Sequence, residues 1–155
     1  MRTVTAVLAI VLLCAPRAAS AQLPQKPVLT LEAARAMVAA GEAHARANGW
    51  NVVIAIVDDG GHAIHLVRMD GTQTASVDVA LAKARTAAGF RRPTRALAEI
   101  VAAGGLGILA VDGVMPLEGG LPVTVDGHVI GAIGVSGVTA QQDGQIAEAA
   151  LAAAR

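Results

Sequence analysis

The stretch Pro116-Leu-Glu-Gly-Gly-Leu-Pro-Val-Thr-Val-Asp-Gly-His-Val-Ile-Gly-Ala-Ile-Gly-Val-Ser-Gly137 decides the fold of this chain. Asp126-Gly127 separates two apolar runs, and this dipeptide predicts a β-hairpin because both turn residues must reach a positive φ. Three glycines interrupt the second run: Gly131, Gly134 and Gly137. Because glycine weakens a strand, they indicate close approach of a helix, a neighbouring subunit or a ligand.

The N-terminal residues carry the pattern of a secretory signal peptide. Arg2 precedes an apolar run over residues 4–15, too short to span a bilayer comfortably, and Ala19-Ser-Ala21 forms an A-x-A cleavage site. Lipoprotein processing at Cys14 is the less favoured alternative, because the large Leu13 directly before it fits that processing poorly.

Three segments follow from this pattern. We expect a signal peptide over residues 1–21, a short Pro-containing lead over 22–28 and a single domain over 29–155. The protein would then be exported, to the periplasm or to the medium.

The composition of the mature chain excludes several classes of protein. Removing Arg2 and Arg17 leaves 10 basic residues against 12 acidic ones, a formal charge of −2, so neither nucleic acid nor an anionic membrane would attract it. No cysteine remains for a disulfide. One Trp, one Phe and no Tyr make a core of small residues, which favours a homo-oligomer, a dimer or larger, over a stable monomer.

Hydrophobic periodicity and capping signals predict the remaining elements. We expect helices over about 31–47, 76–90, 95–103 and 140–153, and strands over 52–57, 62–69 and 106–111 in addition to the hairpin. Neighbouring strands with helices between the groups indicate an α+β fold with a mostly antiparallel sheet rather than a doubly wound parallel one.

Lys83 is the first candidate ligand-binding residue. Val79, Lys83, Thr86 and Phe90 share one helical stripe, so a single cation lies among largely apolar neighbours. An unpaired buried ammonium is costly, and Lys83 must reach water or meet an anion. That anion is either a structural partner such as Asp70, the favoured alternative, or a ligand carboxylate.

Arg68 and Asp70 form a second candidate group at a strand end, where alternation places them on one face and Met69 on the other. Polar groups at the mouth of a sheet contact ligands about as often as they simply face solvent.

The histidines do not predict a zinc site of the protein's own. His62 and His65 fall on opposite faces of one strand, and neither an H-x-x-x-H nor an HExxH spacing occurs. A single histidine could still act as an axial ligand of haem iron.

Covalent catalysis has little support. Ser136 lies in Gly-Val-Ser-Gly137, which lacks the last glycine of a G-x-S-x-G elbow because Val138 takes that position. Phosphate-binding glycine patterns are absent from the sequence as well.

Several blocks, which follow one another along the sequence, resemble the GlcG/HbpS family of haem-binding or "haem-degrading" domains. The same domain is found at the C-terminus of some cobalamin adenosyltransferases. The resemblance covers residues 29–154. Its blocks are Val-Val-Ile-Ala-Ile-Val-Asp-Asp-Gly-Gly-His62, Arg-Met-Asp-Gly71, Ala-Leu-Ala-Lys-Ala-Arg-Thr-Ala-Ala88, Arg-Arg-Pro-Thr94, Glu-Gly-Gly-Leu-Pro122 and Gly-Ala-Ile-Gly-Val-Ser-Gly137.

The resemblance implies a profilin-like fold, a five-stranded antiparallel sheet with helices on both faces, and assembly into dimers or larger rings. It also implies haem as the cofactor of some exported members. It implies that residues 113–117 and the helix of Lys83 lie near the haem. Together with the groups found above, the candidate ligand-binding residues are Arg68, Asp70, Lys83, Val114, Met115, Gly119, Gly120 and Ser136. Where a relative places a hydroxyl side chain near the iron, this chain has Val114 followed by Met115, so the candidate axial ligands are His62, His65 and Met115.

Three functions follow, in order of preference. The first is an exported haem-binding protein whose basic side chains hold the propionates beside a glycine-rich loop. The second is a module or enzyme that binds a small carboxylate, and the third is an oligomeric structural partner of another protein. Enzyme activity is not the favoured expectation, and haem degradation is less favoured still, because no firm axial ligand can be named.

Overall fold

A computed structural model describes residue 23 and residues 25–154 of the chain; the expected signal peptide lies outside this part. Its elements are α1 (Leu31–Ala47), β1 (Val53–Asp58), β2 (Ala63–Arg68), α2 (Ser76–Phe90), α3 (Thr94–Ala102), the 3₁₀ helix η1 (Leu106–Ala110), β3 (Gly120–Val125), β4 (His128–Ser136) and α4 (Ala140–Ala152). In the described residues, no helix combines the length and apolar character needed to cross a membrane.

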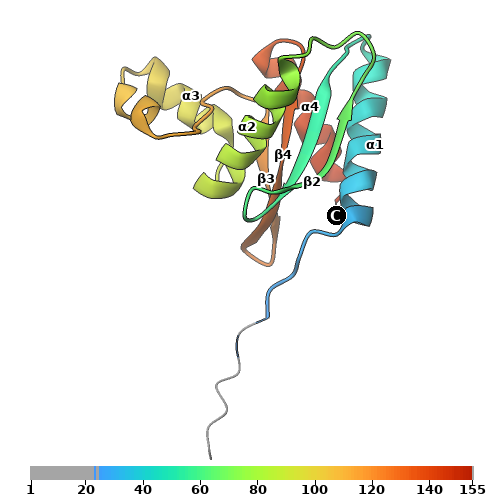
Figure 1. Cartoon of the computed structure of the whole chain (residues 1–155), viewed down its shortest axis with the longest axis horizontal. Helices are drawn as coiled ribbons and strands as arrows, with labels where there is room; N and C mark the ends of the chain where they lie inside the picture. Colours follow the sequence, from blue (N-terminus) through green and yellow to red (C-terminus); the bar gives the residue numbers. More distant parts are fainter. Residues whose placement is uncertain (1–22, 24, 155) are drawn as a thin grey trace, which may run out of the picture.

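The described strands form one antiparallel sheet in the order β2-β1-β4-β3 (Figure 1). β1 lies inside the sheet between β2 and β4, and its residues 53–57 are fully buried. Such a strand must be apolar on both faces, as its sequence is. The expected α+β class with an antiparallel sheet is confirmed.

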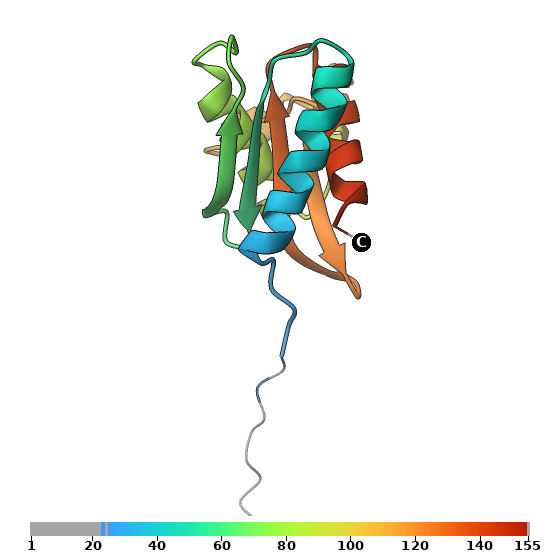
Figure 2. The ribbon, with the colours of Figure 1, turned by 90° about the vertical axis from the view of Figure 1, so that its right-hand side faces the viewer.

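Helices cover both faces of this sheet (Figure 2). On one face, α1 and α4 pack side by side, and Met37, Ile54 and Ile146 share the larger core cluster there. On the other face, α2 packs through small side chains such as Ala84 and Ala87. The three layers agree with the expected helix–sheet–helix arrangement.

One glycine of β4, Gly134, lets α2 approach the sheet closely. A Cβ added at Gly134 would overlap the carbonyl oxygen of Ala80, on α2. At Gly131, an added Cβ would meet the Val57 carbonyl and the Leu29 side chain. Close approach, predicted from the glycine spacing, is therefore confirmed, and the helix is the approaching element at Gly134.

The predicted turns and caps are largely present. Asp126 and Gly127 have φ values of 47° and 77°, and they join β3 to β4 as the hairpin requires. Thr139 and Gln142 form the expected capping box of α4. Thr94, however, does not cap α3: it is the first residue of that helix, and its hydroxyl bonds to Gly120 instead.

The strand expected over residues 106–111 is wrong, and the described sheet has four strands rather than five. This segment forms η1, which follows α3 on an arm that projects away from the sheet (Figure 1). Leu106 and Leu109 are exposed there, so the apolar run that resembled a buried strand has no sheet partner. Short apolar runs do not distinguish a strand from a helical segment.

Candidate functional site

Lys83 lies in the interior of the molecule. Its side chain is 2 % exposed, and its Nζ donates hydrogen bonds to Asp143 Oδ2 at 2.8 Å and to the carbonyl oxygen of Val135 at 2.9 Å. Lys83 therefore pairs with an anion of the protein itself, as the favoured alternative predicted. The anion is Asp143, at the start of α4, rather than Asp70.

The environment of Asp143 is set by burial. Removal from water raises the pKa of the Asp143 carboxyl above its ordinary value, and the hydrogen bond from Lys83 opposes that rise. The side chain is 3 % exposed, so the pair excludes solvent. The Lys83 ammonium is thus committed within the protein and does not face a surface ligand.

Gly119 and Gly120 close over this ion pair. Gly119 has a φ of 120°, and an added Cβ would lie 2.9 Å from Lys83 Nζ. The Gly120 amide donates to Thr94 Oγ1 at 2.9 Å. Both glycines are buried, so they cover the Lys83–Asp143 pair instead of lining an open crevice.

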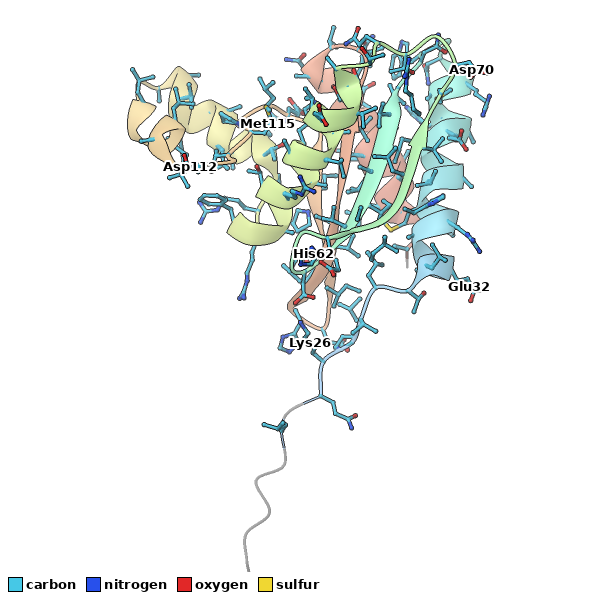
Figure 3. All side chains as sticks on the ribbon, viewed as in Figure 1. Lys26, Glu32, His62, Asp70, Asp112 and Met115 are labelled. Carbon is cyan, nitrogen blue, oxygen red and sulfur yellow. The ribbon has the colours of Figure 1, made fainter. Side chains whose placement is uncertain are left out.

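The loop before this corner is attached to α2 through one hydroxyl group. Thr86 Oγ1 accepts a hydrogen bond from the Met115 amide at 2.9 Å and donates to the Gly113 carbonyl at 3.4 Å. Val114 and Met115 are half-buried. Met115 thus stays near the surface, at the foot of the arm (Figure 3).

Large apolar side chains are exposed along the arm and the loop that returns from it. We call this set the arm surface: Ile100, Leu106, Leu109, Val111 and Leu117, which are 40–61 % exposed. Met115 lies in the same loop as Val111 and Leu117, and Arg92 is exposed where α2 leads into α3. Exposed apolar groups gathered on one segment mark a binding surface.

Arg68 and Asp70 lie at another end of the molecule. Asp70 follows β2 on the side of the sheet away from Met115 (Figure 3). The Arg68 guanidinium donates to the Thr72 carbonyl at 2.8 and 3.1 Å. Arg68 and Asp70 both line a cavity of about 240 Å³. The structure therefore does not bring Arg68 together with Lys83.

Ser136 is also internal. It is 6 % exposed, and its hydroxyl donates to Ser76 Oγ, at the start of α2, at 3.3 Å. This bond joins the end of β4 to α2.

His62 and His65 occupy different environments. His62 is exposed in the turn between β1 and β2, while His65 lies within β2 opposite Ile56 of β1. No group of three or more His, Cys, Asp or Glu side chains that could hold a metal ion occurs among residues 23 and 25–154.

Two residues that sequence reasoning missed lie beside His62. Arg85 and Gly89, on α2, line a cavity of about 370 Å³ together with His62 and the turn glycines. The signal available in the sequence was Gly89, a glycine inside a predicted helix with no turn to explain it.

The Asp59 carboxylate lies at the rim of that cavity, and basic groups stabilise its negative charge. Its hydrogen bond from Lys26 lowers the pKa of Asp59 below the ordinary value, and the charge of Arg91 acts in the same direction. The carboxylate therefore stays ionised near neutral pH with a cation against it.

Comparison with known proteins places this α+β domain in a family. The chain matches the family described as "Haem degrading protein HbpS-like" over residues 29–152, and it belongs to that family. The resemblance seen in the sequence is thus confirmed.

Individual relatives agree with this assignment. Protein GlcG of Escherichia coli K12 is 46% identical over 111 residues, which cover 72% of this chain and 83% of GlcG. The crystal structure of a double mutant of Streptomyces reticuli HbpS superposes with a TM-score of 0.79 at 37% identity, covering 89% of this chain and 95% of that one. A crystal structure of a PduOC–haem complex has a TM-score of 0.76 at 30% identity, covering 82% and 95%.

Proposed function

We propose that this chain is an exported haem-binding protein. Its family is described as haem-degrading, and the PduOC relative is known as a haem complex. Neither description identifies the haem contacts of this chain, so the proposal depends on its own residues.

The observation that carries the proposal is the arm surface beside Met115. A haem ring offers a large flat apolar face, and exposed leucine and valine side chains of the arm would bury it. The Met115 thioether, half-buried in the loop that returns from the arm, is the candidate axial ligand. His62 and His65 lie on the β1–β2 hairpin and are less favoured.

We assign a haem propionate to Arg92 rather than to Lys83 or Arg68. The Lys83 ammonium is already bonded to Asp143, and the Arg68 guanidinium is bonded to the Thr72 carbonyl at the end of β2. Arg92 is exposed at the base of the arm, where a guanidinium could meet a carboxylate.

Hemin titration tests this assignment. We expect the native protein to shift the Soret band of hemin, and Met115→Leu, which keeps the apolar volume but removes the sulfur, to change the visible bands of the bound haem. Met69→Leu, at the end of the molecule near Asp70, is the matched control and should bind as the native protein does. A Soret band that only follows free hemin would refute haem binding.

Export is proposed from residues 1–21 of the sequence. Secretion in a bacterial host with cleavage after Ala21 should leave Gln22 as the first residue, which intact-mass measurement would detect. A product that retains the full mass and stays with the cells would contradict export.

A further inference from the structure

A cavity separate from the arm surface lies between the β1–β2 turn and the end of α2. It has a volume of about 370 Å³ and is lined by Asp59, Gly60, Gly61, His62, Arg85 and Gly89. This volume falls at the small end of the range for ligand pockets in proteins. The turn in question lies below the lower end of α2, at the label of His62 (Figure 3).

Gly89 has no structural reason to be glycine. It lies inside α2, its φ is not positive, and an added Cβ would meet nothing within 4 Å. The left-handed residue that ends the helix is Arg91, with a φ of 53°, so Gly89 does not serve as the terminating glycine either. A helical glycine is less stable than alanine, and here its one evident effect is to leave the cavity wall open.

Arg85, an exposed residue of α2, presents its guanidinium to the same space. Its Nε donates to the Gly61 carbonyl at 3.1 Å, and its Cγ lies 3.3 Å from where a Cβ of Gly61 would be. Among the residues that the structure describes, no carboxylate oxygen lies within 4.0 Å of this guanidinium. Its two terminal nitrogens therefore remain available for a planar anion.

The turn that carries His62 is held rigid by Asp58. The Asp58 Oδ1 atom accepts hydrogen bonds from the amides of Gly60 at 2.9 Å and His62 at 2.8 Å. The Asp58 charge is thereby directed into the turn, and the Asp59 charge is matched by Lys26 and Arg91. The groups that remain to donate hydrogen bonds toward the cavity are the Arg85 guanidinium and the His62 ring.

We propose that this cavity is a carboxylate-binding site in which Arg85 forms the bidentate contact and His62 donates a second hydrogen bond. Gly89 leaves the room that the anion occupies. The carboxylate comes either from a free small organic acid or from the propionate of a haem. This site does not depend on haem binding at the arm surface.

Calorimetric titration with succinate tests the free-acid source. We expect succinate to bind at low ionic strength and its neutral analogue succinamide not to bind. Arg85→Gln should weaken succinate binding about tenfold or more, since charge-assisted bonds are lost. Arg35→Gln removes a positive charge from α1, on the other face of the sheet, and should leave binding unchanged.

Gly89→Ala provides a second variant that keeps the fold. It should raise the melting temperature, because alanine favours the helix, and yet weaken succinate binding by taking up part of the space beside Arg85. Gly107→Ala is the matched control. An added Cβ at Gly107 would also meet nothing within 4 Å, but Gly107 lies in η1, outside the cavity. Together these two alanine variants separate loss of the site from loss of the fold.

Titration with hemin and with hemin dimethyl ester, which has no free carboxylate, tests the propionate source. If Arg85→Gln weakens hemin binding but not ester binding, the site holds a propionate. If native hemin binding is insensitive to Arg85 and succinate does not bind, the carboxylate site is refuted while the haem proposal stands. If succinate binds and needs Arg85 while hemin does not bind at all, the carboxylate site is supported and the haem proposal is refuted.

Discussion

At Lys83, helical spacing places an ammonium group on an apolar stripe, and the fold supplies Asp143 to meet it. Removing one member of a buried ion pair leaves an uncompensated charge, which is strongly destabilising. Replacing both members with apolar groups is far less harmful. The pair therefore holds the start of α4 to the centre of α2.

We predict that Asp143→Asn lowers the free energy of unfolding by about 3–5 kcal/mol in urea unfolding experiments. The double variant Lys83→Met with Asp143→Leu should regain most of this loss, because no charge is then buried. Asp112→Asn, at an exposed position of the arm loop, is the control and should change stability by less than about 0.5 kcal/mol. An Asp143→Asn variant as stable as the native protein would show that the pair contributes nothing.

Asp59 gives a prediction about pH. Its carboxyl has a lowered pKa in the folded protein, chiefly through the hydrogen bond from Lys26. The contact therefore contributes stability above about pH 3.8, and this contribution is lost as the pH falls through the lowered pKa. In NMR titrations, Lys26→Met should raise the pKa of Asp59 toward its ordinary value, and Lys26→Arg should keep it low. Titration of native Asp59 at its ordinary pKa would contradict the contact.

The sequence predicted which side chain needs a partner but did not identify that partner. The apolar neighbours of Lys83 marked it as needing an anion, but Asp143 is 60 residues away and lies on another helix. Only the packing of α2 against the end of β4 brings the two together. Likewise, Ser136 and Gly120 look accessible as sequence motifs and are covered once α2 and Thr94 are in place.

Among the elements, the contact between α2 and β4 is the most demanding. Backbone meets backbone at Gly134, so no side chain can move aside to admit a methyl group. We predict that Gly134→Ala lowers the free energy of unfolding by about 1–3 kcal/mol, as overpacking does. Urea unfolding should find the opposite sign for Gly89→Ala, which lies on the open side of the same helix and should gain about 0.5 kcal/mol. Equal tolerance at the two positions would contradict this packing.

Element prediction succeeded where local chemistry and packing agree. The Asp126-Gly127 hairpin, the Thr139 capping box and the buried β1 strand each carry a local signal that the fold uses. It failed at residues 106–111, where an apolar run forms a 3₁₀ helix on the arm. The leucines of that run are exposed, and the periodicity of the sequence does not distinguish an exposed apolar run from a buried one.

For the whole molecule, the arm surface bears on assembly. The family resemblance and the small-residue core both led us to expect an oligomer. We propose that copies of this chain meet partly through the arm, so that a haem bound at the arm surface would lie between subunits. Light scattering after size exclusion should find a lower mass for the variant with Leu106→Glu and Leu109→Glu than for the native protein, since buried charge opposes association. Leu31→Glu, at an exposed position of α1, is the control and should keep the native mass. A native protein that is already monomeric would refute the proposal.

The bond between Thr94 and Gly120 has a consequence for how this molecule can vary. It ties the first residue of α3 to the first residue of β3, so the excursion from 95 to 119 departs from and returns to one spot. The outer part of this excursion, residues 103–112, can be shortened, lengthened or exchanged while the buried Leu97 and the contacts of Met115 and Gly119 stay in place. Divergence of recognition among proteins built on this scaffold would then concentrate in that interchangeable segment, with the threonine–glycine clasp as its fixed boundary.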